Sequence, residues 1–199
     1  MKRLSLTSVL LPAALSLGGC AVLGGGTPAL DTYDLSAPDA PAARGRHHGQ
    51  ILIAEPGALK ALDGQNIVIR TGGPGSIQFL KGAQWADRLP LVVQAKLAQA
   101  FQSAGGFNGV GTPGEGLAID YQVVAELRAF EVRVGGGTHA EVEIYVRLLN
   151  DRNGTVKASK VFRASAPVSG EGNDAYVRGL DAAFGAAGAE IVEWVDGQV

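Results

Sequence analysis

Apolar and polar residues alternate between residues 119 and 166, as they do in strands with one buried and one solvated face. The alternation falls into three stretches, which are residues 119–134, 140–148 and 156–166. Gly135–Gly137 separates the first two stretches, and Asn150–Gly154 separates the last two. Both separators have the composition of tight turns. The pattern therefore predicts an antiparallel meander of three strands with one wet face.

The alternation changes phase inside the first of these stretches. Apolar residues stand at every second position as far as Leu127, but after Ala129 they continue at Phe130 and Val132, on the other set of positions. One extra residue in a strand turns the following side chains to the opposite face of the sheet. The sequence therefore predicts a β-bulge near Ala129.

Four shorter apolar runs precede the meander, at residues 33–35, 50–54, 66–70 and 76–80. Each is short and apolar, as expected of a strand. Residues 72–75 read Gly-Gly-Pro-Gly, a turn composition, because glycine permits positive φ and proline fixes its own φ. The last two runs are therefore predicted to pair as a hairpin.

Between Gln84 and Ala104 the period lengthens to that of a helix. Leu89, Val93, Leu97 and Phe101 recur every four residues and form one apolar stripe. Pro90 fits the first turn, where its missing N–H costs no hydrogen bond, Asp87 is the predicted N-cap, and Gly105-Gly106 ends the helix.

A second helix is predicted near the C-terminus, where apolar residues from Val177 to Trp194 follow a spacing of three and four. Asn173 or Asp174 is the predicted cap. This helix contains Gly179, Gly185 and Gly188, which weaken a helix unless its backbone approaches another element closely, so we expect such contacts. The elements together predict an α+β fold: a mostly antiparallel sheet with two amphipathic helices packed on one face.

The first residues read as an export signal rather than as part of the domain. A basic start at Lys2-Arg3 leads into an apolar run from Leu4 to Leu17 that is too short to span a bilayer of roughly 30 Å. Leu17-Gly18-Gly19-Cys20 follows as a lipobox, which predicts cleavage between Gly19 and Cys20 and lipidation of the Cys20 sulfur. The alternative is an ordinary signal peptide with a coincidental cysteine. The predicted divisions are a signal at 1–19, a lipidated Gly-rich tether at 20–30 and a single domain at 31–199.

Composition narrows the function classes. The formal charge is −2, and removal of Lys2 and Arg3 would make it more negative, which argues against nucleic-acid binding. Cys20 is the only cysteine, so the domain contains no internal disulfide. No second apolar stretch reaches membrane-spanning length, so the chain is predicted to be anchored to a membrane through lipid. Cys20 is followed by alanine and not by the aspartate that favours inner-membrane retention, which favours the outer membrane.

No set of residues in the sequence indicates catalysis, a cofactor or a metal. His47-His48 and His139 are the only histidines, and without a cysteine ligand they make a poor zinc set, so the adjacent pair is interpreted as solvated. There is no G-x-S-x-G motif, and the glycine runs lack the residues of a P-loop. Five carboxylates fall on the predicted wet face and are interpreted as solvated surface groups: Asp120, Glu126, Glu131, Glu141 and Glu143. The chain is therefore predicted not to be an enzyme.

The order of motifs resembles the ABC-type transport auxiliary lipoprotein family, which comprises outer-membrane lipoproteins encoded with MCE-type lipid transporters (the paraquat-inducible protein C group). The matching pieces, in chain order, are the lipobox Leu17–Cys20, Tyr33-Asp34-Leu35, Ile51-Leu52-Ile53 with Pro56, Leu62-Asp63 through Arg70, Ile77-Gln78-Phe79, Trp85-Ala86-Asp87 with its helix, Asp120-Tyr121 through Glu131, and the final helix with Ile191 and Trp194. The resemblance covers nearly the whole chain after Cys20, and Trp85-Ala86-Asp87 is its most specific piece.

The resemblance implies a non-enzymatic accessory of an ABC system that moves phospholipids or other hydrophobic molecules. Its partners would be an MCE-domain protein, a permease and an ATPase, and a homo-oligomer is a further implied possibility. Two other hypotheses stay open: a structural envelope lipoprotein and a tethered envelope hydrolase. The predicted partner surface is the wet face or edge of the sheet with the turn at Gly135, Gly136 and Gly137.

Overall fold

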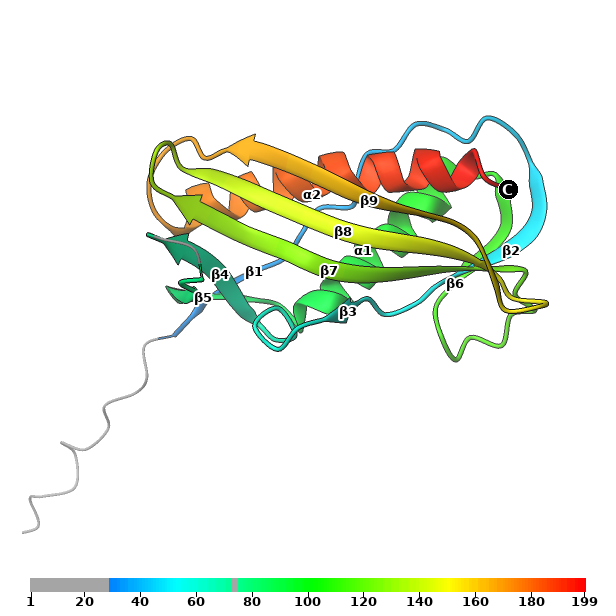
Figure 1. The fold of residues 1–199 in the computed structure, drawn as a ribbon, viewed down its shortest axis with the longest axis horizontal. Helices are drawn as coiled ribbons and strands as arrows, with labels where there is room; N and C mark the ends of the chain where they lie inside the picture. The colour runs from blue at the N-terminus through cyan, green and yellow to red at the C-terminus, as the bar shows by residue number, and fades with distance from the viewer. Residues whose placement is uncertain (1–28, 73–74) are drawn as a thin grey trace, which may run out of the picture.

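The computed structural model describes residues 29–72 and 75–199. The predicted signal, Gly19, Cys20 and most of the predicted tether lie outside these residues. The described chain forms strands and two helices in this order: β1 (Asp31–Tyr33), β2 (His47–Ile53), β3 (Gly57–Ala58), β4 (Asn66–Thr71), β5 (Gln78–Trp85), α1 (Leu89–Ala104), β6 (Phe107–Gly111), β7 (Tyr121–Val134), β8 (His139–Asn150), β9 (Thr155–Pro167) and α2 (Asn173–Asp196). In Figure 1 the long strands β7, β8 and β9 lie in front of both helices.

The long strand β7 organises the sheet. On one side it pairs antiparallel with β8, which pairs antiparallel with β9, and these three strands are the predicted meander. On its other side β7 pairs in parallel with β2, β3 and β4, one after another along its length. The predicted hairpin of β4 and β5 is antiparallel, and β1 and β6 extend the sheet in parallel beside β5 and β2. The predicted α+β class is confirmed, with a mixed sheet whose longest pairings are antiparallel.

The predicted bulge lies at Arg128. Leu127 pairs with Ile144 and Ala129 pairs with Glu143, so Arg128 is the extra residue on β7. Leu127 faces the core before the bulge, and Phe130 faces it after the bulge. The change of phase therefore keeps apolar side chains inward along the whole strand.

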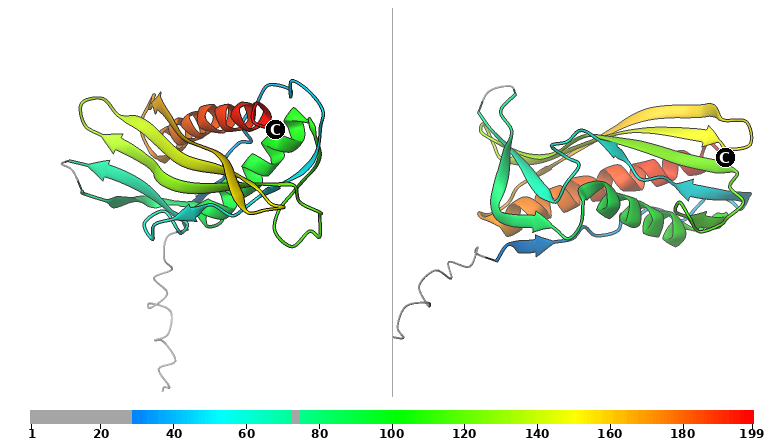
Figure 2. Two further views of the ribbon diagram at one scale, coloured as in Figure 1. Left: turned by 45° about the vertical axis from the view of Figure 1, so that its right-hand side comes forward. Right: turned by 90° about the horizontal axis from the view of Figure 1, so that it is seen from below.

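Both helices cover the same face of the sheet (Figure 2). α2 contacts β8, β9 and β7, whereas α1 lies beside α2 and against β2 and β6. Their apolar stripes enter one core with the inward side chains of the sheet; its largest fully buried members include Trp85, Phe101, Phe130, Phe162 and Phe184. We call the opposite side of the sheet the open face. Within the described part of the chain, neither helix is long and apolar enough to cross a membrane.

The start of α1 differs from its prediction in one respect. Pro90 lies in the first turn as expected, and Gly105 follows the last residue. Asp87 is not the N-cap, however, because that position belongs to Arg88, which makes no side-chain capping bond. The Asp87 carboxylate instead accepts a hydrogen bond of 2.6 Å from the Arg88 N–H, and this local turn takes the oxygen that a cap would use.

The predicted caps of α2 are also wrong. Gly172 is the N-cap, with a φ of 83° that glycine adopts readily. The Asn173 side chain donates a hydrogen bond of 3.1 Å to the carbonyl of Lys81 in β5. The Asp174 carboxylate accepts one of 2.6 Å from the Tyr33 hydroxyl in β1. Both side chains therefore fasten the helix to the sheet.

The bond between Tyr33 and Asp174 gives a pH prediction. The hydrogen bond to the Asp174 carboxylate, with smaller effects of burial and negative charge, raises the pKa of Tyr33 to about 12. A pKa above the ordinary value of about 10 means that this contribution to stability is complete below pH 10 and is lost as the pH rises towards 12. We expect the ultraviolet titration of tyrosinate to show a late-ionising residue among the four tyrosines. D174N should lower its pKa, and the control D181N should leave it unchanged.

Two of the three helix glycines have the close contacts that the sequence predicts. A methyl group at Gly179 would lie 2.9 Å from Val168 Cγ2, and one at Gly188 would lie 2.9 Å from Pro38 Cβ and overlap the neighbouring Cγ. At Gly185 the same methyl group would meet nothing within 4 Å, so the expectation is wrong there.

These helix contacts predict opposite results for one substitution at two positions. Gly188→Ala should destabilise the fold by about 1–3 kcal/mol, because the added methyl group must displace the Pro38 ring. Gly185→Ala should stabilise it by roughly 0.5–1 kcal/mol, because alanine loses less conformational entropy in a helix and the space is open. Urea denaturation measures both free energies. If the free energy of unfolding changes in the same direction for both variants, the close contact between Pro38 and α2 is contradicted.

Candidate interaction surface

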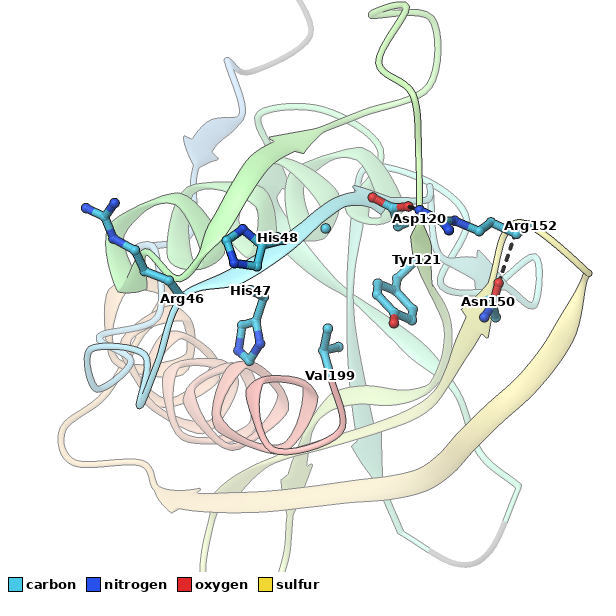
Figure 3. Close-up of a pocket in the computed structure, with 9 residues that line it drawn as sticks. Arg46, His47, His48, Asp120, Tyr121, Asn150, Arg152 and Val199 are labelled. Carbon is cyan, nitrogen blue, oxygen red and sulfur yellow. Dashed lines mark hydrogen bonds and ion pairs between the residues drawn. The ribbon is translucent and has the colours of Figure 1, made fainter.

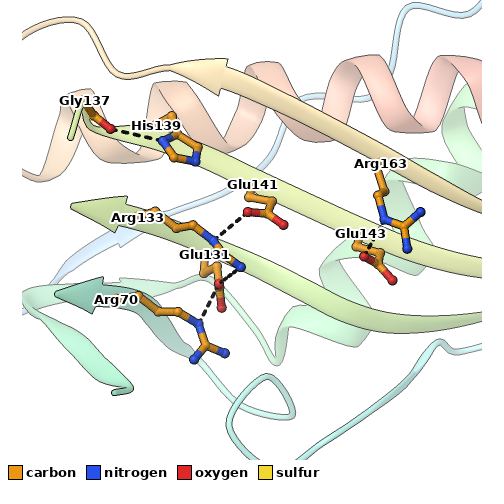
Figure 4. A network of polar contacts seen from close by, with 8 residues as sticks. All are labelled: Arg70, Glu131, Arg133, Gly137, His139, Glu141, Glu143 and Arg163. Carbon is orange, nitrogen blue, oxygen red and sulfur yellow. Dashed lines mark hydrogen bonds and ion pairs between the residues drawn. The ribbon is translucent and has the colours of Figure 1, made fainter. Parts of the chain in front are cut away.

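The open face carries a network of ion pairs centred on Glu131 (Figure 4). Arg70 from β4 donates through Nε to Glu131 Oε1 over 2.6 Å, and Arg133 from β7 reaches the same oxygen through Nη2 over 3.1 Å. Arg133 also pairs through Nε with Glu141 Oε2 at 2.6 Å. Two arginines therefore share one carboxylate, and a second carboxylate pairs with one of them.

Glu131 corrects the interpretation of the carboxylates as solvated. The bulge turns Glu131 to the open face, where it lies between the two arginines. Only 2% of the residue is exposed there. Glu126 is exposed and pairs with Arg128 at 3.3 Å, and Glu143 pairs with Arg163 at 2.8 Å. Ion pairs therefore occur along the whole length of the open face. Most such pairs at a surface add little stability, whereas a buried one requires its partners.

At the opposite end of the sheet a depression of about 430 Å³ contains the adjacent histidines (Figure 3). His47 is not solvated as expected: its Nε2 lies 2.7 Å from Asp196 Oδ1, and its side chain is 15% exposed. His48 is exposed, and His139 lies at the other end of β8 with its Nδ1 3.1 Å from the carbonyl of Gly137. Within residues 29–72 and 75–199, no cluster of three or more His, Asp or Glu could hold a metal ion.

Asp120 lines this depression, and both of its carboxylate oxygens have partners. The N–H of Gln50 donates to its Oδ2 over 2.9 Å, and Arg152 pairs with its Oδ1 at 2.6 Å. The backbone hydrogen bond first, and then Arg152, hold the pKa of Asp120 below its ordinary value. The group is therefore charged at neutral pH and joins β2, β7 and the β8–β9 turn; this protonation state suits a structural acceptor and not a general acid.

The end of the sheet at Gly135 has a different character. A trough of about 550 Å³ lies there, lined by Arg70, Gly72, Gly75, Arg133, Val134, Gly135 and His139. Gly135, Gly136 and Gly137 all have positive φ, and no heavy atom lies within 4 Å of a methyl group built on any of them. The predicted partner surface is therefore an exposed turn beside an arginine-lined trough, and its role stays a prediction.

Comparison with known families decides the class of this chain. The family model for the ABC-type transport auxiliary lipoprotein component matches residues 33–192, from β1 almost to the end of α2. The chain belongs to this family. The family is described as the auxiliary lipoprotein component of ABC-type transport, so this part of the resemblance is confirmed.

Comparisons with individual proteins add similarities in sequence and in fold. The auxiliary lipoprotein is 32% identical over 176 residues to the uncharacterized protein bll6063 of Bradyrhizobium diazoefficiens; the match covers 86% of this chain and 46% of that one. The chain thus spans about half the length of this relative. The crystal structure of protein XCC0632 from Xanthomonas campestris superposes with a TM-score of 0.75 at 25% identity, covering 84% of this chain and 96% of the other. The protein CT253 of Chlamydia trachomatis shares the fold, with a TM-score of 0.53 at 11% identity over 76% of this chain and 98% of that one.

Proposed function

We propose that this chain is a docking accessory of an MCE-type ABC system that moves phospholipids or other hydrophobic molecules through the envelope. Its lipidated Cys20 would hold it at the periplasmic face of the outer membrane, and its partners would be the MCE-domain protein, the permease and the ATPase. The family match over residues 33–192 carries this proposal. Cargo class, MCE partner and outer-membrane location go beyond that match.

The start of the fold is compatible with such an anchor. β1 begins at Asp31, so the proposed tether, residues 20–30, would join the lipid to the first strand of the sheet. A random-coil chain of this length would span about 18 Å on average and at most about 40 Å when extended. The domain would therefore stay close to the membrane surface while it contacts a partner.

The open face with the turn at Gly135–Gly137 is the proposed docking surface. The core lies under the helices, so this face is free to take part in an interface, and its arginines and glutamates could pair with charged groups of a partner. A second copy of the chain is the other candidate occupant. The hydrolase hypothesis is less well supported, because Glu131, Glu141 and Glu143 are all held by arginines.

Co-purification from detergent-solubilised membranes tests the proposal. We expect mass spectrometry to identify a permease, an ATPase and an MCE-domain protein with the tagged wild-type chain. Gly136→Trp should reduce their recovery. Gly154→Trp is a matched control, because Gly154 also has a positive φ and open space but lies in the β8–β9 turn at the other end of the sheet. Recovery of the wild-type chain without any transporter subunit would favour the structural lipoprotein instead. Equal recovery with both variants would remove the turn from the docking surface.

A further inference from the structure

The trough at the Gly135 end is lined in part by Gly72 and Gly75 of the β4–β5 hairpin, and this hairpin carries two exposed apolar residues that the ion-pair network does not use. The hairpin of β4 and β5 projects beyond the rest of the sheet there (Figure 2). On this hairpin Ile77 is 43% exposed and Phe79 is 45% exposed, although both are large and apolar. Exposed apolar residues beside a depression are typical of a binding surface.

Strand register places Phe79 on the same face of the sheet as the arginines. Phe79 pairs with Val68 on β4, and Val68 pairs with Glu131 on β7. Paired residues of neighbouring strands point to the same side of a sheet, so Phe79 shares the open face with Glu131. Arg70 lies two residues after Val68 on β4 and therefore also points to this face. Phe79 thus lies on the same face of the hairpin as Arg70, which lines the trough.

Arg70 has hydrogen-bond donors left over. Its Nε is held by Glu131, and no other acceptor among the described residues takes its two Nη groups. Arg133 has both its Nε and its Nη2 engaged. A guanidinium fixed at one edge presents the remaining N–H groups in a set geometry, which suits the oxygens of a phosphate. The buried Glu131 therefore acts as a positioning residue for Arg70.

We propose that this trough binds the phosphate group of an amphiphile, with Arg70 as its principal ligand and Ile77 and Phe79 in contact with the apolar part. The volume of about 550 Å³ lies in the range of small-molecule pockets. The phosphate could belong to a lipid headgroup or be free in solution. The oxyanion site rests on the geometry, and the choice of an amphiphile also rests on the proposed function in moving hydrophobic molecules.

Calorimetric titration of the chain from residue 20 onward, carrying Cys20→Ser, tests the site. This chain includes every residue of the core, which runs from Leu35 to Val195. The probes are dihexanoyl phosphatidic acid, the uncharged dihexanoylglycerol and inorganic phosphate. We expect phosphatidic acid to bind more tightly than either of the others. If inorganic phosphate binds as tightly as phosphatidic acid, the site belongs to the free ion and the proposed amphiphile is overturned. If dihexanoylglycerol binds as tightly as phosphatidic acid, the proposed oxyanion site is overturned.

Matched variants locate the binding. R70Q should weaken phosphatidic acid about tenfold or more, because a hydrogen bond to a charged group is lost. The control R163Q, on the same face and 66% exposed, should stay within about twofold. F79S should weaken phosphatidic acid and leave inorganic phosphate unchanged, whereas V156S, at an exposed valine near the β8–β9 turn, should change neither.

A second variant at the same position separates loss of binding from loss of folding in R70Q. R70K keeps the charge but removes the planar fork, and it should give an affinity between those of wild type and R70Q. Circular dichroism shows whether each variant is folded. Absence of binding by the wild-type chain, or equal binding by folded R70Q, R70K and R163Q, would overturn the site. Co-purification with transporter subunits is measured in membranes, so either proposal can fail while the other stands.

Discussion

Replacement of Cys20 by serine is expected to abolish acylation of the chain completely. The sulfur of Cys20 is the atom proposed to carry diacylglycerol, and no other cysteine in the sequence could replace it. Anchoring requires more than one acyl chain, because a single chain binds membranes only marginally. We therefore expect wild-type cells to incorporate labelled palmitate into this protein and C20S cells to incorporate none. Mass spectrometry of the wild-type protein should show an acylated N-terminal residue at position 20.

A glycine in the tether provides the control for this prediction. Gly25→Ser adds the same hydroxyl group a few residues beyond the lipobox and should leave the palmitate label unchanged. The membrane fraction then distinguishes the outer from the inner membrane by density. A wild-type protein with an unmodified Cys20 sulfur would contradict the anchor, and with it the proposed location, but it would not affect the family membership over residues 33–192.

The sequence predicted secondary structure best in strands whose side chains are either clearly buried or clearly solvated. The strands of the meander alternate between apolar and polar residues because one face is buried and the other is not, and the single change of phase marks the bulge, so β7, β8 and β9 were predicted together with it. β6 was missed, because two of its five residues are glycines and it contains no apolar run. β3 has only two residues and no pattern of its own. Their pairing with β2 and β7 depends on residues far away in the chain.

The parallel pairings and the helix caps could not be predicted for a related reason. Which strands border β7 is decided by packing between segments distant in sequence, so the hydrophobic pattern alone favoured a mostly antiparallel sheet. Asp87, Asn173 and Asp174 each have the residue type of an N-cap. In the structure their side chains find other partners, in a local turn, in β5 and in β1. Residue type gives a list of possible hydrogen bonds, and tertiary structure selects among them.

The same limit applies to the candidate site. The turn at Gly135–Gly137 was predicted from composition, but the trough beside it was not, because Arg70 is distant in sequence from Glu131 and Arg133. The bulge was the one available signal: a phase change that turns Glu131 to the face of the arginines. The sequence pattern places Glu131 on the solvated face. Its burial could be recognised only from the structure, which brings Arg70 and Arg133 to it. The histidine pair is a second example. His47 was interpreted as solvated, but in the structure it lies beside Asp196, which is distant in sequence.

Truncation of Phe130 is expected to be the most destabilising single change in the domain. Its ring lies 5.8 Å from that of Trp85 in an edge-to-face arrangement and 6.0 Å from that of Phe184. It therefore joins β5, β7 and α2, and it is 1% exposed. Phe130→Ala should cost about 3–5 kcal/mol, because the lost contacts leave a cavity that rigid strands on both sides cannot close. For a domain of this size the melting temperature should fall by roughly 10 °C.

A second phenylalanine serves as the control for this cavity. Phe79 lies on the open face and is 45% exposed, so Phe79→Ala should cost less than about 1 kcal/mol. Phe130→Leu, which keeps most of the volume, should fall between the two alanine variants. Urea denaturation with a constant m-value measures all three changes. Equal costs for Phe130→Ala and Phe79→Ala would contradict the inward direction of Phe130, and therefore the bulge at Arg128, since that extra residue decides which face each of the following side chains occupies.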